Sequence, residues 1–233
     1  MFLNYEYSMA VEVTTVPFEQ QLKSMENIKK GFTNVITVLR DDKLLESLLR
    51  TRRIWEYHRN LLKLALEVLE NAYKGKTYIL YAPFCVIVKP LLAPIGMIMP
   101  EKFVFGVDFE GMVKGELVEF ILLTEPACVN DKTAAHVLLH ESLHAAGEKF
   151  IHPELEEAAE KVIDYLVDLL AYYRPEYIAP SKELIVAPSP MMSGIAGRRA
   201  YELLREGKCI GYYTFKDKLA EYIEKDIIKT VPV

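Results

Sequence analysis

The chain has 233 residues, of which 51% are hydrophobic and 26% charged, and this composition is typical of a globular protein with one sizeable core. Its formal net charge of −5 disfavours a surface that binds the phosphates of nucleic acid. The apolar stretch 77–100 is interrupted by prolines and by Lys89, so it does not predict a membrane-spanning helix. We therefore expect neither nucleic acid nor a membrane as a partner.

The three cysteines, Cys85, Cys128 and Cys209, are widely separated and lack CxxC spacing. Such a pattern predicts packing residues in a reducing compartment, and neither a disulfide framework nor a cysteine metal site. The N-terminal residues 1–6 have neither the basic start nor the apolar centre of a signal peptide. These features together predict a cytoplasmic protein.

Residues 1–76 are predicted to form an N-terminal helical region. One helix is expected over 19–40, where Gly31 can interrupt it. Asp41 and Asp42 can cap a second helix, in which leucines recur at helical spacing from Leu44 to Leu69 until Gly75 ends it. We expect these helices to pack on the rest of the chain, with an oligomer through them as the other option.

Residues 77–124 contain short runs rich in β-branched and aromatic side chains, bounded by proline and glycine. They predict strands at 78–81, 84–88, 103–109 and 117–124. The segment 110–115 predicts a turn, so the last two runs are expected to form a hairpin. A small antiparallel or mixed sheet should result.

Helices are predicted again after the sheet. Asp131 can cap a helix over 132–146 that Gly147 ends, and residues 152–154 start another helix that runs to about Tyr173. Two short helices are expected at 197–206 and 216–229. The predicted class is α+β, with residues 77–233 as one domain on which the N-terminal region 1–76 packs.

The string His140-Glu141-Ser142-Leu143-His144 lies in the middle of the 132–146 helix. Two histidines four residues apart share one helical face, so their imidazoles can converge on one metal ion. A zinc ion bound in this way keeps a position open for water, whose pKa falls towards about 7. Glu141 is placed to accept a proton from that water and to pass it on to a leaving amine. The residues around the string are uncharged, as a buried zinc helix requires.

The stretch from Val137 to Ala146 resembles the active-site helix of the zincin metallopeptidases, and the resemblance covers mainly residues 117–170. It implies a zinc-dependent enzyme that hydrolyses peptide bonds, with a peptide or protein as substrate and Zn²⁺ as cofactor. It also implies an edge strand of the sheet that pairs with the extended substrate. The alternative hypothesis is a non-catalytic binding or regulatory protein with a zincin fold.

A third metal ligand must come from outside the string, and the candidates are His152, Glu156, Glu157 and Glu160. Related families place a histidine six residues after the second one, but Phe150 stands there in this chain. The gluzincin branch instead uses a glutamate on the next helix, often with an aspartate four residues later that hydrogen-bonds a ligand histidine. Glu160 and Asp164 match this pair, and both lie on the flank of the apolar stripe of their helix. Glu160 is therefore the predicted ligand.

Two further roles are left open by the sequence. His136 shares the helical face of His140, and we interpret it as a packing residue or as a residue that supports a ligand. A positive or hydroxyl group is expected to stabilise the oxyanion of the reaction. The candidates for that role are Tyr165, Tyr172, Tyr173, Arg198 and Arg199.

Overall fold

The computed structural model describes residues 13–88, 102–147, 156–184 and 194–233. In this part of the chain the α-helices are α1 (Phe18–Leu39), α2 (Asp42–Arg50), α3 (Glu56–Glu70), α4 (Asp131–Gly147), α5 (Glu156–Tyr173), α6 (Ile195–Arg205) and α7 (Tyr212–Glu224). The strands are β1 (Thr77–Ala82), β2 (Cys85–Val88), β3 (Lys102–Val104), β4 (Gly106–Val113), β5 (Glu116–Thr124), β6 (Cys209–Gly211) and β7 (Lys229–Thr230). Short 3₁₀ turns lie at η1 (Asn71–Lys74), η2 (Glu125–Cys128) and η4 (Ser181–Glu183). The mixture of helices and small sheets confirms the α+β class.

The strands form two small mixed sheets. In the larger sheet the order is β4-β5-β1-β7, with β1 parallel to β5 and antiparallel pairing at the other two boundaries. In the smaller sheet, β2 lies between an antiparallel β3 and a parallel β6. The order places β4 at one end of the larger sheet, beside α4.

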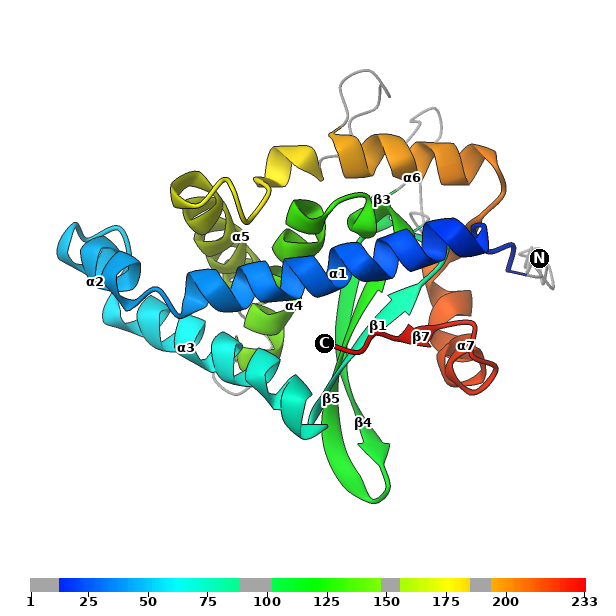
Figure 1. Ribbon diagram of the computed structural model, residues 1–233, viewed down its shortest axis with the longest axis horizontal. Helices are drawn as coiled ribbons and strands as arrows, with labels where there is room; N and C mark the ends of the chain where they lie inside the picture. Colours follow the sequence, from blue (N-terminus) through cyan, green and yellow to red (C-terminus); the bar gives the residue numbers. More distant parts are fainter. Residues whose placement is uncertain (1–12, 89–101, 148–155, 185–193) are drawn as a thin grey trace, which may run out of the picture.

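Helices cover both faces of the larger sheet (Figure 1). Alternate residues of β1 and β5, such as Ile79 and Ile121, point into a core that they share with α1, α3, α4 and α5. The intervening residues, such as Leu80 and Leu122, pack with Phe215 and Tyr222 of α7 on the other face. The hairpin of β4 and β5 extends beyond this body, so the outer half of β4 is more exposed than the half beside α4.

Helix α4 is the centre of the larger core, because helices and sheet surround it. The helix is buried on nearly every side, including Ala134, Leu138 and Ala145. Its contact with α1 depends on Gly31, where a Cβ atom would lie 2.7 Å from the carbonyl oxygen of Asp131 and 2.8 Å from the amide nitrogen of Ala135. Gly31 thus lets two helix backbones approach closely. Helix α1 continues through Gly31 without the interruption that was predicted there.

The predicted helix from Asp42 to Gly75 is wrong in its length, because it is divided into α2 and α3. The chain turns over 51–55, where Arg52 has a positive φ of 54°. Asp41 caps α2 as expected, since its side chain accepts a hydrogen bond of 3.0 Å from the amide of Leu44. The turn redirects the chain while the leucines on either side of it keep their places in the core.

Other boundaries also differ from the prediction. The helix predicted over 216–229 spans Tyr212–Glu224 instead, because the chain turns at Asp226, with a positive φ of 55°, and then enters strand β7. The run 103–109 belongs to two strands, β3 and β4, and the hairpin turn is Lys114-Gly115, later than expected. Both turn residues have positive φ, 52° and 85°, as a tight hairpin requires. Helix α4 includes Asp131, because the side chain of Asn130 accepts the bond from Thr133 that caps it. The predicted start of α5 at 152–154 lies outside the described residues.

The prediction that no cysteine forms a disulfide is wrong, since Cys85 and Cys209 are bonded to each other. They are 124 residues apart in the chain but directly opposite each other on the parallel strands β2 and β6. Cys128 is free and buried, as predicted for a packing residue. Disulfides persist mainly in oxidising compartments and in some hyperthermophile interiors, so the cysteines no longer support the predicted cytoplasmic location. Within the described residues, none of the helices has the length and apolar character needed to cross a bilayer.

Candidate metal centre

The two histidines of the HExxH string lie side by side on the face of α4 that meets α5. Their Nε2 atoms are 3.1 Å apart, so both rings are aimed at the same point. The rings are reachable from solvent, with 17% of the His140 side chain and 26% of the His144 side chain exposed. The rings therefore neither face apart nor lie in a sealed interior.

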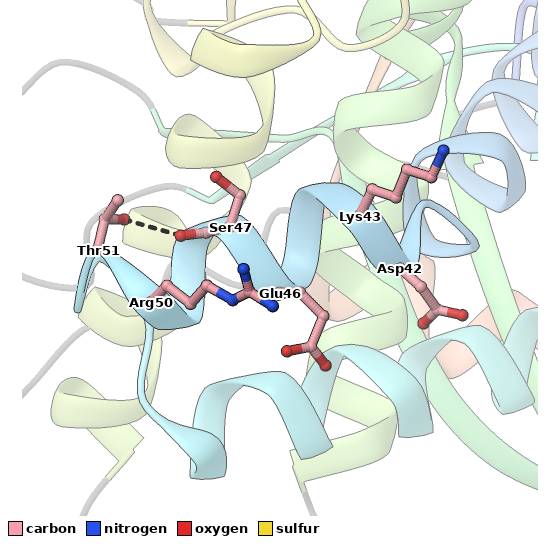
Figure 2. Close-up of a pocket in the computed structure, with 6 residues that line it drawn as sticks. All are labelled: Asp42, Lys43, Glu46, Ser47, Arg50 and Thr51. Carbon is pink, nitrogen blue, oxygen red and sulfur yellow. Dashed lines mark hydrogen bonds between the residues drawn. The ribbon is translucent and has the colours of Figure 1, made fainter.

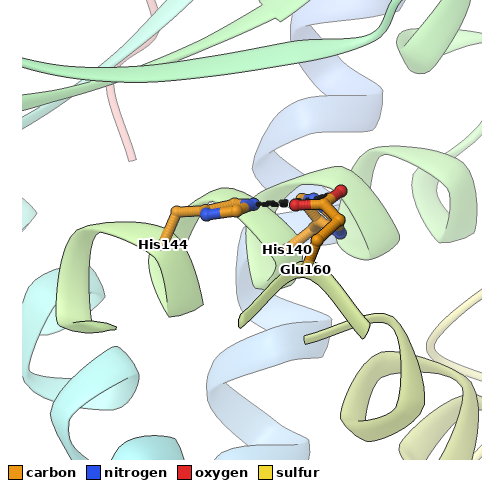
Figure 3. Close-up of side chains that lie close together, drawn as sticks. All are labelled: His140, His144 and Glu160. Atoms are coloured by element: carbon orange, nitrogen blue, oxygen red, sulfur yellow. Dashed lines mark hydrogen bonds and ion pairs between the residues drawn. The ribbon is translucent and has the colours of Figure 1, made fainter. Parts of the chain in front are cut away.

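Glu160 of α5 completes a three-residue cluster with these histidines (Figure 3). Its two carboxylate oxygens lie 3.4 Å from the Nε2 atom of His140 and 2.9 Å from that of His144. A tetrahedral zinc ion with bonds of about 2.0–2.2 Å would separate its ligand atoms by about 3.4 Å. The residues present therefore fit a divalent metal ion of the zinc type, with one position left for water or substrate. Glu160, which is predicted as the third ligand, is the carboxylate that lies beside both histidines.

Asp164 lies one turn beyond Glu160 on α5 and faces the other nitrogen of His140. Its carboxylate oxygen is 3.6 Å from Nδ1 of His140. A carboxylate at this nitrogen favours the tautomer that carries the proton on Nδ1, which leaves Nε2 free to bind a metal. Asp164 is thus placed to orient the ligand ring.

Charges in the cluster are strongly coupled. Burial opposes protonation of both histidines, but hydrogen bonds to Glu160 and the nearby Glu141 charge outweigh it, so the pKa of each ring is raised. Hydrogen bonds from the same two rings hold the pKa of Glu160 well below its usual value. A cation at this point would replace the protons that the rings otherwise attract.

The side chain of Glu141 points from α4 towards the larger sheet, where it contacts strand β4. Its side chain packs against Gly106, where a Cβ atom would lie only 2.5 Å from its carboxylate oxygen. Asp108 follows two residues later on the same face of β4 and is partly buried. Burial is the main cause of the raised pKa of Glu141, and the charge of Asp108 adds to it. Glu141 is therefore held beside the two histidines by the end strand of the sheet.

The chain matches no family of known proteins, and neither the curated proteins nor the solved structures contain a match to it. The case for a function consequently depends on the residues of this site and on their geometry.

Asp108 and Gly106 are the site residues that the sequence analysis missed. Gly106, Asp108 and Glu110 alternate along β4 and share a strand face. The signal available in the sequence was Asp108 itself, an acidic residue on the strand face that lies against a helix. The predicted run 103–109 contains both residues, but the sequence does not indicate which face of the strand meets α4.

His136 has a structural role. Its Nδ1–H donates a hydrogen bond of 2.7 Å to the carbonyl oxygen of Ala179, and its ring is nearly parallel to that of His140. Burial lowers the pKa of His136 to about 4, so the ring is neutral near pH 7. His136 thus anchors the segment after α5 against α4, in agreement with its interpretation as a packing residue.

Several other candidates lie elsewhere or outside the description. His152 is outside the described residues, and the side chains of Glu156 and Glu157 at the start of α5 are also not described. Of the oxyanion candidates, Tyr165 donates its hydroxyl to the carbonyl oxygen of Arg53, and Arg199 pairs with the buried Glu125. Those two residues therefore serve contacts between elements.

A surface hollow on α2 is separate from the candidate metal centre (Figure 2). Its lining consists of Asp42, Lys43, Glu46, Ser47, Arg50 and Thr51. The hollow is formed by one short helix, and its two acidic and two basic side chains give it no preference for a charge. It offers no converging group that would bind a particular ligand.

Proposed function

We propose that the protein is a zinc-dependent metallopeptidase that hydrolyses peptide bonds through water activated at the His140, His144 and Glu160 cluster. The observation that carries the proposal is the convergence of two histidine nitrogens and a glutamate carboxylate on one point, with Glu141 near enough for the charges of both histidines to act on it. Sites of this kind, with three protein ligands and one open position, are typical of catalytic zinc.

Strand β4 supplies a place for an extended substrate. It is the end strand of the larger sheet among the described strands, and it passes beside Glu141 at Gly106. A peptide that added to this edge would pair its backbone with β4 and bring a peptide bond next to the histidine cluster. The resemblance to zincins implies this mode of binding.

Glu141 would act as the general base. A bound zinc ion would supply a lowered water pKa and polarise the scissile carbonyl group. Glu141 accepts the proton of the attacking water and then donates it to the departing amine nitrogen. Asp164 holds the ring of His140 in the tautomer that binds metal, and Gly106 leaves the space that the Glu141 side chain occupies. The electrostatic influence of the metal would keep Glu141 ionised despite its burial.

The replacement of Glu141 by glutamine tests this proposal. Glu141→Gln keeps the size of the side chain but removes the base, so peptide hydrolysis should fall by about 10²–10⁴-fold while zinc binding is retained. The assay follows cleavage of a mixed peptide library by mass spectrometry and zinc content by elemental analysis. Glu110→Gln is a matched control, because Glu110 is exposed on the outer part of β4. This substitution should leave peptide hydrolysis and zinc content unchanged.

Two outcomes would contradict the proposal. Undiminished hydrolysis in Glu141→Gln would remove Glu141 from the mechanism. A wild-type protein that binds zinc but cleaves no peptide would favour the alternative function, a binding or regulatory protein that uses zinc for structure.

A further inference from the structure

The turn that joins α2 to α3 is basic, although the chain as a whole carries a formal net charge of −5. Three exposed arginines lie within four residues of one another there, namely Arg50, Arg52 and Arg53. Residues 47–55 contain no acidic side chain, and the glutamates on either side, Glu46 and Glu56, both pair with Arg59. Among the ion pairs of the described residues, none includes one of the three arginines. Their charges are therefore available to an anionic partner.

Aromatic side chains are exposed at the same turn. Trp55, the only tryptophan of the chain, is 72% exposed, and Tyr57 is 49% exposed. Tyr165 of α5 is also exposed and lies beside the turn, because its hydroxyl donates a hydrogen bond of 2.6 Å to the carbonyl oxygen of Arg53. Such rings join an apolar body to a polar tip, so they favour the boundary between water and an apolar phase. We call these residues together the basic aromatic surface, which consists of Arg50, Arg52, Arg53, Trp55, Tyr57 and Tyr165.

The backbone beneath this surface is held in place. The amide of Arg53 donates a hydrogen bond of 2.9 Å to the carbonyl oxygen of Leu48, and the next side chain, Ile54, is buried in the core. The amide of Trp55 donates to Nδ1 of His58 at 3.2 Å. A surface on a fixed backbone loses little conformational entropy when a partner binds.

We propose that the basic aromatic surface docks the protein on the anionic face of a phospholipid membrane. The arginines would contact lipid phosphates, and the ring of Trp55 would lie at the level of the headgroups, where tryptophan is favoured. The surface lies at the end of the molecule where α2 meets α3 (Figure 1), so a flat partner can reach it. The hollow that Arg50 lines on α2 also contains Asp42 and Glu46, and these carboxylates disfavour an acidic peptide as the partner.

Docking of this kind is compatible with the other features of the chain. We predicted no membrane partner because the stretch 77–100 cannot span a bilayer, but binding to a membrane surface needs no spanning helix. The surface is also separate from the candidate metal centre. Tyr165 follows Glu160 by five residues, which turns it about 140° around α5. It contacts the turn, whereas Glu160 faces the histidines of α4. The inference therefore does not rest on the proposed function.

The fluorescence of Trp55 tests the inference directly, because no other tryptophan contributes. The full chain is titrated at low ionic strength with vesicles of phosphatidylglycerol and phosphatidylcholine. We expect the emission to shift to shorter wavelength, and added salt to reverse the shift. Arg50→Gln with Arg53→Gln should weaken binding by about tenfold to thirtyfold, since each charge near an anionic membrane contributes about a factor of five. Lys23→Gln with Lys29→Gln removes two exposed charges from α1 and should change the affinity by less than about threefold.

Several results would overturn the inference. One is an emission that anionic vesicles leave unchanged, and another is an equal shift with vesicles of phosphatidylcholine alone. Equal losses of affinity in the arginine and lysine variants would attribute binding to net charge. An equal shift with polyglutamate or a single-stranded oligonucleotide would assign the surface to a soluble polyanion. Zinc content and peptide hydrolysis should not change in the arginine variant, so failure of the peptidase proposal would leave this result standing.

Discussion

At the scale of single residues, the sheet side of α4 differs from its α5 side in charge and in burial. His140, His144 and Glu160 meet where α4 faces α5, and they remain partly open to solvent. Glu141 faces β4 and is almost fully buried, although it carries an acidic group. Burial of a lone carboxylate is costly, and proteins generally retain such groups where a reaction or a ligand uses them. Beyond its first two residues, the ionisable side chains of α4 are therefore His136 and the three candidate site residues His140, Glu141 and His144.

The neutral state of His136 should make the metal-free protein less stable in acid. Its pKa is about 4 in the folded protein against 6.5 for an ordinary histidine, so between these values only the unfolded chain binds the proton. The contribution of His136 to the free energy of unfolding is fully present above pH 6.5. It is lost as the pH falls towards 4, and the total loss is about 3 kcal/mol. Urea unfolding of the metal-free protein at several pH values measures this loss.

His136→Asn is the matched variant, because its amide can still donate to the carbonyl oxygen of Ala179 but does not titrate. The difference in unfolding free energy between wild type and variant should therefore narrow or reverse between pH 6.5 and pH 4. Parallel pH profiles of the two proteins over that range would show that His136 is not held neutral by burial.

At the scale of elements, local patterns were predictable and long-range pairings were not. Helical spacing alone places His140 beside His144, and helical phase together with the zincin resemblance selected Glu160. The division between α2 and α3 was missed because leucine spacing continues across a turn that depends on the backbone of Arg52. The strands β6 and β7 have only three and two residues, too few for a periodic signal. Asp108 was missed because the charged groups that influence it are on another element, α4.

The crossing of α1 and α4 supplies a test at this scale. Gly31→Ala would normally favour a helix by about 1 kcal/mol. Here the added methyl group would meet backbone atoms of α4 at 2.7 and 2.8 Å, and those atoms cannot move without shifting α4. We expect a net loss of about 1–3 kcal/mol in the free energy of unfolding, measured by urea denaturation.

Thr33→Ala is the control for this change, because Thr33 is an exposed residue of the same helix. It should alter the free energy of unfolding by less than about 0.5 kcal/mol. A Gly31→Ala protein as stable as the wild type would mean that α1 does not pack so closely on α4.

At the scale of the whole molecule, one core links the N-terminal helices to the site. Residues of α1, α2 and α3 share a buried cluster with α4 and α5, so these N-terminal helices contribute to the support of α4. The disulfide links β2 to β6 outside this cluster. An oligomer through the N-terminal helices stays a prediction.

Reduction of the disulfide should destabilise the protein. The bond closes a loop of 124 residues, and loops of this size confer about 2–5 kcal/mol by restricting the unfolded chain. Dithiothreitol should therefore lower the Tm of the wild type and leave that of a Cys85→Ala, Cys209→Ala double variant unchanged. Thiol titration of the unfolded, unreduced protein should detect one free cysteine, Cys128, and detection of three would show that the bond is absent.

Zinc titration of variants at the candidate third ligand tests the central claim most directly. The wild-type protein should bind one zinc ion per chain, and Glu160→Gln should weaken binding by more than the 10–100-fold typical of residues that only support a ligand. Glu156→Gln and Glu157→Gln, on the same helix, should bind zinc as the wild type does. Unchanged zinc affinity in Glu160→Gln, or a wild-type protein that binds no zinc at neutral pH, would contradict the account.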